Sequence, residues 1–451
     1  MPGRAVMTGV VIGAVYVLSP LFVLSMAGFA LLLRWAYRSA DHVERRWVMA
    51  LLVVAMAARL AVIAALFLST DHDSTPFGWL FGDEEYFIRR GIWLANLALG
   101  IPISLADVHY AFDDLIHTSF VWVLATLNVL VGPAQYGVRF VSALLYLTGA
   151  FAMYRIVRPS FGPAAALSGL TLLLFLPSLF AWSVSVLKEP VFFALLAAII
   201  AMTVAASRQP AWAIRAAAVI GVVLLAYAAE TVRDGGLVVA GAGTAIGVAM
   251  AIGAARPRLL WAAIAVAAIF APVAIANGRV QDTATAAVTA AARRHWHHVN
   301  AAGHSYMIFE PTFYREEPVA GNLTAANGAR LAAGGLLAYI TVPTPWQMQS
   351  RAELVYLPEQ LIWYGMVIML PFGIVAGFKR DSLLTSILIG HLVVAVALVA
   401  LTSGNIGTLV RHRALAMPYV VWFSGLGLCV VLRVLAGARS TGQFALREAG
   451  A

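Results

Sequence analysis

Length, composition and charge place this chain among multispan membrane proteins. Its 451 residues are 62% hydrophobic and only 11% charged, whereas about 25% of residues are charged in an ordinary soluble domain. A mean hydropathy of +0.86 leaves too little polar surface to cover a water-soluble protein of this length. A disulfide scaffold is excluded because Cys429 is the only cysteine. The net charge of +9 has to be divided between the two sides of a membrane, and nothing in the sequence suggests a nucleic-acid partner.

Eleven apolar runs are close to the roughly 20 residues that a membrane-spanning helix needs. They lie at about 9–33, 47–69, 138–156, 163–182, 189–206, 212–229, 236–254, 259–276, 360–378, 383–402 and 414–432. Another run, 118–131, is shorter and ends in Gly-Pro, so we expect it to lie at the membrane surface. The expected fold is an all-α membrane protein of about eleven transmembrane helices, with 1–451 forming a single transmembrane domain.

The distribution of charge predicts the orientation of these spans. With the N-terminus outside, the inner connections hold fifteen basic and four acidic residues, and the outer connections hold fourteen and seventeen. Short basic loops mark the cytoplasm. Two long segments, 70–137 and 277–359, then lie outside. Few ionisable residues fall within the spans, chiefly Arg59 and His391, so the chemistry is expected at the outer face rather than along a path through the bilayer.

The first long segment concentrates carboxylates next to the membrane. It contains the run Gly82-Asp83-Glu84-Glu85-Tyr86. Asp83 is the expected N-cap of a following helix, and acids suit the positive end of that helix, so a capped surface helix explains the run as well as a functional site does. Carboxylates at this position also suit proton abstraction from a hydroxyl group, or the binding of a divalent cation.

Four basic residues at outer ends of spans are candidates for binding a lipid phosphate. They are Arg139, Lys188, Arg411 and Arg413. A lipid-linked substrate places its phosphate at headgroup level, where guanidinium and ammonium groups bind it well. Each of these residues could instead extend its charge toward the interface while its aliphatic part stays in the membrane. Their number on the outer side, against the usual charge bias, favours phosphate binding.

The later acids of the first long segment and the histidines of the second are explained better as surface residues than as a functional site. The later acids of the first segment are Asp107, Asp113 and Asp114, for which a solvated acidic face is expected. The second segment contains several histidines, among them His295, His298 and His304. A zinc site needs three or four ligands of compatible reach. Without cysteines or a His-Glu-x-x-His pattern, a basic, aromatic surface resting on lipid headgroups is the better interpretation.

The order of these features resembles the GT-C class of membrane glycosyltransferases, which includes protein mannosyltransferases and the aminoarabinose transferase of lipid A. The acidic run, the interfacial segment, and a later Arg-His-Arg followed by proline occur in that order. The segments that carry the resemblance are 82–86, 118–131, 135–144, 154–158, 161–162 and 411–418. Where such enzymes have His-Pro-Pro after the acidic loop, this chain has His117-Thr118-Ser119.

The resemblance implies an enzyme that takes a sugar from a polyprenyl-phosphate or pyrophosphate carrier and attaches it to an extracytoplasmic glycan, lipid or protein. Asp83 would be the base, supported by Glu84 and Glu85. The phosphate would be bound by Arg411, Arg413, Arg139 and Lys188, and the substrate cavity lined by Tyr86, Glu189, His412 and Arg233. No cofactor follows from the sequence, although the acids would permit a divalent cation. The Ala- and Arg-rich composition indicates a high-GC bacterium, and hence a bacterial cytoplasmic (inner) membrane.

Two alternatives share parts of this pattern. An O-antigen-type polymerase or ligase also has many spans, a large outer loop and arginines that bind undecaprenyl pyrophosphate. It predicts that the essential residues concentrate in 277–359 and that Asp83 is dispensable. A transporter of a lipid-linked substrate would move its substrate across the membrane without making a bond. Transfer activity therefore separates the enzyme interpretations from the transporter.

Overall fold

The computed structural model describes residues 3, 6, 7, 9, 19–75, 77–113, 118–302, 306–319, 324–348 and 354–448. In this part of the chain the regular structure is helical, apart from one isolated bridge between Met307 and Asn405. The chain divides into two compact units. Unit 1 comprises Met1–Pro159 and Leu170–Ala240, and unit 2 comprises Ser160–Gly169 and Gly241–Ala451. The expected fold class, an all-α multispan protein, is confirmed.

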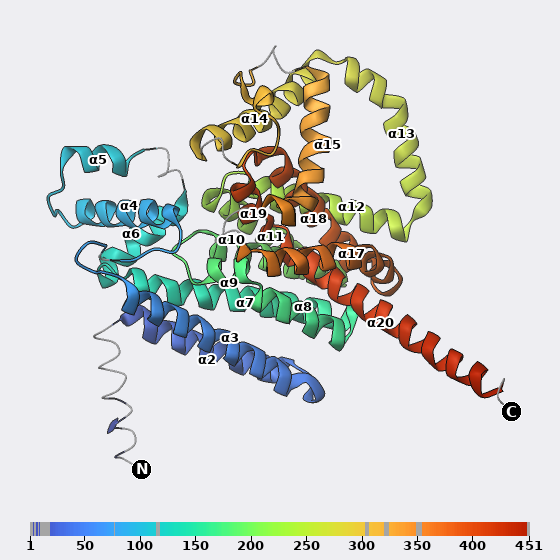
Figure 1. Ribbon diagram of the computed structural model, residues 1–451, viewed down its shortest axis with the longest axis horizontal. Coiled ribbons are helices and arrows are strands. Elements are labelled where there is room, and N and C mark those ends of the chain that lie inside the picture. The colour runs from blue at the N-terminus through green and yellow to red at the C-terminus, as the bar shows by residue number, and fades with distance from the viewer. Residues whose placement is uncertain are drawn as a thin grey trace. The chain divides into compact units, whose positions relative to one another are not determined.

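Unit 1 holds the first ten labelled helices, two of which extend into unit 2 at one end (Figure 1). They are α2 (Pro20–Ser39), α3 (His42–Ser69), α4 (Gly82–Ala98), α5 (Leu105–Ala111), α6 (Ser119–Val131), α7 (Gln135–Phe161), α8 (Pro163–Phe175), α9 (Pro177–Ser183), α10 (Glu189–Arg208) and α11 (Trp212–Val232). Helices α2 and α3 lie side by side, and α4 packs on α6. The first long segment is thus a small helical layer rather than an open loop.

Unit 2 holds the remaining helices, the first of which begins in unit 1. They are η2 (Val238–Ala242), α12 (Gly243–Ala255), α13 (Pro257–Ala276), α14 (Gly278–Ala302), η4 (Pro311–Tyr314), α15 (Ala325–Thr341), η5 (Pro345–Gln347), α17 (Leu357–Arg380), α18 (Ser382–Thr402), α19 (Ile406–Arg413) and α20 (Met417–Glu448). Glycines allow close packing here: a Cβ atom at Gly373 of α17 would overlap the carbonyl group of Phe423 in α20.

Nine helices in the described residues are long and apolar enough to cross a membrane, and a bent pair makes a tenth if it is one span. Eleven were expected. The one remaining expected span coincides with α13, where the described residues contain a shorter apolar stretch, Pro257–Phe270. The segment expected at the surface is α6, a helix of 13 residues, which is shorter than the bilayer core requires.

The bent pair is α8 and α9, which meet at Pro177 with an angle of 62°. Proline has no N–H group, so the carbonyl group of Leu173 loses its helical donor. The Tyr146 hydroxyl donates to that carbonyl oxygen at 2.7 Å. The buried guanidinium of Arg59 donates to the next carbonyl, of Leu174, at 3.0 Å. Arg59 therefore completes the hydrogen bonding of a broken helix, which explains an arginine inside a span.

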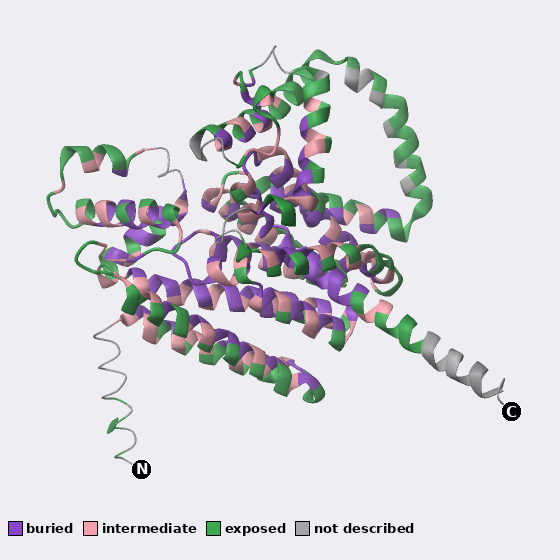
Figure 2. Cartoon of the chain, in the orientation of Figure 1, coloured by how far each residue is buried: buried purple, intermediate pink, exposed green. Residues whose placement is uncertain are grey.

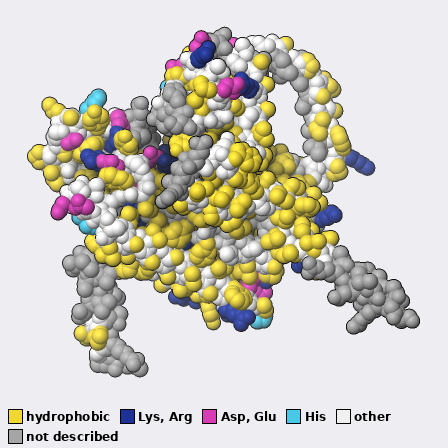
Figure 3. Space-filling model, viewed as in Figure 1, with side chains coloured by type: hydrophobic (Ala, Val, Ile, Leu, Met, Phe, Trp, Pro, Cys, Tyr) yellow, Lys and Arg dark blue, Asp and Glu magenta, His cyan; other side chains and the backbone are white. Residues whose placement is uncertain are grey.

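Large apolar side chains remain exposed along the candidate spans. On α2, Leu24 and Leu31 are 60% and 66% exposed, and on α11, Val223 and Leu224 are 61% and 64% exposed. Figure 2 shows such exposed positions along the outward sides of α2, α3 and α13. On the face drawn in Figure 3, hydrophobic side chains cover much of the surface of the long helices. Surface of this kind is what lipid would cover.

Candidate functional site

The acidic run forms the first turn of α4. The helix begins at Gly82, and its N-cap is Phe81, so the expectation that Asp83 is the N-cap is corrected. The capping acceptor is Glu84: its Oε1 accepts from the backbone N–H groups of Leu80 at 2.9 Å and Phe81 at 3.1 Å. A carboxylate that reaches back in this way satisfies N–H groups that the helix itself leaves without acceptors.

Glu84 also forms an ion pair with Arg139 of α7. Its Oε2 lies 2.7 Å from Arg139 Nη1, and both side chains are fully buried. The same oxygen accepts from the N–H group of Val186 at 2.9 Å. Arg139 in turn donates to the carbonyl groups of Gly78 at 2.8 Å and Val184 at 3.0 Å. The pair therefore joins the start of α4 to α7 and to the connection between α9 and α10.

This arrangement changes the assignment of two predicted site residues. Arg139 was expected to bind a donor phosphate and Glu84 to assist the base. Since the charged groups of both are buried against each other and against backbone groups, we assign them to positioning the loop. A buried ion pair that also bonds several backbone groups holds the surrounding backbone in one arrangement.

Asp83 differs from Glu84 because its side chain is exposed at the helix start. Glu85 pairs with Arg89 one turn later, and Tyr86 is 54% exposed. Lys188 lies at the N-cap of α10, with its Nζ 5.7 Å from the ring centre of Phe87. Positions four apart share a helix face, so Lys188 lies beside the side of α4 that carries Asp83.

A second ion pair ties the neighbouring ends of α10 and α11. Glu189 is 3% exposed, and its Oε1 lies 3.0 Å from Nη1 of Arg233. The Thr118 hydroxyl donates to the carbonyl group of Val232 at 2.6 Å, which attaches the start of α6 to the same corner. Glu189 and Arg233, both predicted to line the cavity, therefore contact each other, and Glu189 directly follows Lys188.

The later acids of this segment are not all solvated. Asp113 forms a two-point ion pair with Arg90 of α4, so the expected acidic face is corrected at that position. Asp107 lies partly exposed in the first turn of α5. Asp114 and His117 lie outside the described residues.

In unit 2, the second long segment packs on the turn between α18 and α19. The backbone N–H of Ile308 donates to the carbonyl group of Gly404 at 3.0 Å. Tyr314 Oη lies 3.0 Å from Nε2 of His295, a residue with no exposed surface. Nδ1 of His298 lies 2.7 Å from the carbonyl oxygen of Thr402. These contacts fix the segment just ahead of the Arg-His-Arg run.

Burial determines the ionisation of this histidine–tyrosine pair. Desolvation, reinforced by the neighbouring His298, lowers the pKa of His295 to about 4, so its ring is neutral at physiological pH. Burial also raises the pKa of Tyr314 to about 12. Within the described residues, no three His, Cys, Asp or Glu side chains are grouped so that they could hold a metal ion. His304 lies outside the described residues.

The Arg-His-Arg run closes α19. Arg411 is partly exposed, and the ring of His412 lies 6.0 Å from that of His298. Arg413 is only 1% exposed: it donates to Gln360 Oε1 at 2.9 Å and to a carbonyl group near η5, and its guanidinium lies 4.6 Å from the ring of Trp363. Burial lowers the pKa of Arg413 to about 10, which leaves it protonated.

The space around Arg413 is too small for a phosphate. The cavity lined by Gln360, Trp363, Val410 and Arg413 has a volume of about 10 Å³, the lower limit for a single water molecule. Arg413, predicted to bind the donor, therefore acts on the packing of α17 and α19. Arg411 is the residue of this run that we retain for phosphate binding.

The helical architecture defines a polytopic membrane protein. Residues 119–276 match the family of dolichyl-phosphate-mannose-protein mannosyltransferases, which confirms the resemblance to GT-C membrane glycosyltransferases. The match covers about a third of the chain and includes Arg139 and Lys188, whereas Asp83 and Arg411 lie outside it. It supports a membrane glycosyltransferase that uses a lipid-linked sugar donor. No curated protein and no solved structure matches the chain.

Proposed function

We propose that this protein transfers a sugar from a polyprenyl-phosphate or pyrophosphate carrier to an acceptor hydroxyl on the extracytoplasmic side of the membrane. The family match over 119–276 is the observation that carries the proposal. The acceptor would be a glycan, a lipid or a protein. The site residues we assign in unit 1 are Asp83 as base and Lys188 as a partner of the carrier phosphate. In unit 2, we propose Arg411 as a phosphate-binding residue.

The first turn of α4 supports the role of Asp83. A general base needs a carboxylate that the acceptor can reach, on a backbone that does not move. Asp83 is exposed, while the adjacent Glu84 anchors the same turn through its buried ion pair with Arg139. In this proposal, Glu84 anchors the turn and Asp83 contacts the substrate.

The chemistry follows from these placements. The acceptor hydroxyl attacks the anomeric carbon and gives its proton to the Asp83 carboxylate. The bond between that carbon and the phosphate oxygen breaks, and its electron pair leaves with the phosphate. A cation near the leaving oxygen stabilises the added charge, which is the role proposed for Lys188.

The test is transfer by the purified full-length protein in lipid vesicles. Radiolabelled polyprenyl-phosphate sugars are supplied with a membrane extract as the source of acceptors, and the label in glycan, lipid and protein fractions is counted. We expect one donor to be consumed and its sugar to appear in one acceptor fraction. If no donor is consumed while labelled lipid crosses the vesicle membrane, the protein is a transporter and the proposal fails.

The same assay distinguishes the polymerase or ligase alternative. A polymerase or ligase would consume undecaprenyl-pyrophosphate glycans rather than single sugars on a carrier phosphate. Its activity would depend on residues of 277–359 and would not need Asp83. Full activity of Asp83→Asn with a glycan donor would favour that alternative over the proposed transfer.

A further inference from the structure

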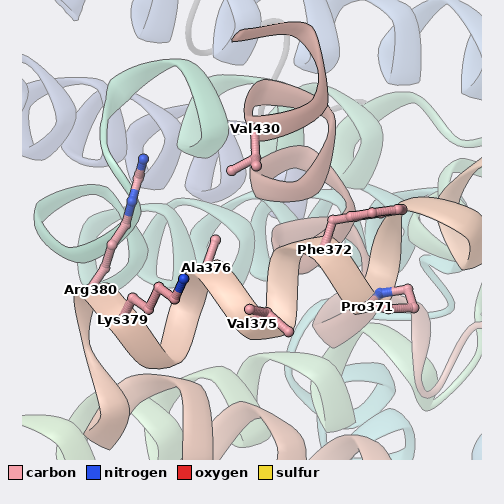
Figure 4. A pocket seen from close by; sticks show the side chains of 7 residues that line it. All are labelled: Pro371, Phe372, Val375, Ala376, Lys379, Arg380 and Val430. Atoms are coloured by element: carbon pink, nitrogen blue, oxygen red, sulfur yellow. The ribbon is translucent and has the colours of Figure 1, made fainter. Parts of the chain in front are cut away.

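A groove runs along α17 in unit 2, and one residue of α20 borders it (Figure 4). Apolar side chains that include Phe372, Val375 and Val430 line it, with Lys379 and Arg380 at one end. Its volume is about 480 Å³, within the range of about 300–1,000 Å³ that is usual for ligand pockets. It is distinct from the residues assigned to sugar transfer.

The groove lies beside the close contact between α17 and α20. Their backbones come together at Gly373 and Gly427, where a Cβ atom would overlap the partner helix. Val430, three residues after Gly427 on α20, lines the groove. The side chains of Phe372 and Val375 are 49% and 57% exposed, so the lining is open to whatever surrounds a span. In a membrane, that surrounding is acyl chain.

The basic residues at one end of the groove are Lys379 and Arg380. Lys379 is exposed and makes no ion pair with any acid in the described part of the chain. Asp381 follows it closely but accepts from the N–H group of Leu384 and from the hydroxyl of Ser160. Arg433 lies three residues after Val430 on α20, so the two positions lie on the same helix face. Both helices therefore carry a basic residue next to the apolar lining.

We propose that this groove binds one anionic phospholipid, with an acyl chain along the apolar lining and the phosphate on Lys379. Basic groups between transmembrane helices at a membrane surface recognise anionic headgroups in this way. A zwitterionic lipid has no net charge to attract it to Lys379. The residues 379–381 fall in the connections that the charge distribution assigns to the cytoplasm, so the lipid would belong to the inner leaflet. The proposal does not depend on the proposed sugar transfer.

The test is lipid retention by the full-length protein. Protein is taken from nanodiscs of phosphatidylcholine with a minor fraction of phosphatidylglycerol, and bound lipids are counted by native mass spectrometry. We expect one retained phosphatidylglycerol molecule and no equivalent phosphatidylcholine molecule. Lys379→Gln should lower that retention about fivefold, the effect of one cation near an anionic surface. Arg34→Gln, at an exposed arginine of α2 on the same predicted side, should leave it unchanged.

A second variant tests the apolar part. Val375→Trp fills the groove from an exposed position without altering charge, and it should also reduce retention. Equal retention of the two lipids by the native protein would overturn the proposal. So would equal losses in Lys379→Gln and Arg34→Gln, or full retention in Val375→Trp.

Discussion

Glu84 Oε2 lies 2.7 Å from Arg139 Nη1 with both side chains buried, one residue away from the exposed Asp83. The ion pair connects α4, α7 and the backbone of Val184 and Val186. It fixes where the first turn of α4 stands relative to Lys188. We therefore predict that substitution of Glu84 lowers stability, whereas substitution of Asp83 lowers the rate of sugar transfer.

Glu84→Gln should destabilise the protein strongly. The substitution leaves the Arg139 charge buried without a counterion, which typically costs about 3–5 kcal/mol. The midpoint of thermal unfolding in detergent would measure the loss. Glu85→Gln is the matched control, because Glu85 forms only a surface pair with Arg89, typically worth about 0–1 kcal/mol. Equal shifts in the two variants would contradict the anchoring role of Glu84.

Tyr146→Phe should destabilise the protein, because it removes a hydrogen bond at the break between α8 and α9. The Tyr146 hydroxyl is the donor to the Leu173 carbonyl group that Pro177 leaves without one, and losing it leaves a buried acceptor unsatisfied, at a cost of about 1–3 kcal/mol. Thermal unfolding again provides the measurement, with Tyr227→Phe, at a side chain 67% exposed, as the control. A loss no larger than that of Tyr227→Phe would show that the carbonyl group finds another donor.

His295 should make the stability of unit 2 depend on pH. Its pKa is about 4 in the folded protein against an ordinary value of 6.5, so between these values the unfolded chain binds more protons than the folded one. The contribution is fully present above about pH 6.5 and is lost as the pH falls toward 4, in total about 3 kcal/mol.

The comparison of variants isolates this effect from that of the carboxylates. His295→Gln should show a smaller fall in unfolding temperature between pH 6.5 and pH 4 than the native protein. His297→Gln, at an exposed histidine, should keep the native slope. Identical slopes in all three proteins would exclude His295 as the source.

Substitutions of the two arginines of α19 should have different effects, on donor binding for Arg411 and on stability for Arg413. Arg411→Ala should weaken donor binding by about 1.5–3 kcal/mol, the value of a hydrogen bond to a charged group, with little change in unfolding temperature. Arg413→Gln should instead lower the unfolding temperature, because Arg413 is buried against Gln360 and Trp363. Titration with a radiolabelled polyprenyl phosphate measures the first effect. Unchanged affinity in Arg411→Ala would remove that residue from the site.

The sequence predicted the helical class and most of the spans, because a length near 20 apolar residues is a local property. For the same reason it predicted that α6 is shorter than a membrane-spanning helix. The helix break at Pro177 was absent from the prediction because its partners, Arg59 and Tyr146, come from other helices.

Tertiary partners also explain which parts of the candidate site were assigned differently. The sequence does not show which of Asp83, Glu84 and Glu85 is buried. The contacts of Glu84 with Arg139 and Val186 show that it is Glu84. The sequence likewise does not show which of Arg411 and Arg413 is buried. The hydrogen bond from Arg413 to Gln360 identifies Arg413. A charge next to the membrane can be recognised from sequence, but whether it faces substrate depends on packing that the sequence does not display.

The most direct test of the central claim compares Asp83→Asn with Asp107→Asn in the vesicle transfer assay. Removing a general base typically lowers the rate about 10²–10⁴-fold, so we predict that loss for Asp83→Asn with an unchanged unfolding temperature. Asp107, a partly exposed acid of the same segment, should be replaceable without loss. Native transfer rates in Asp83→Asn would contradict the account.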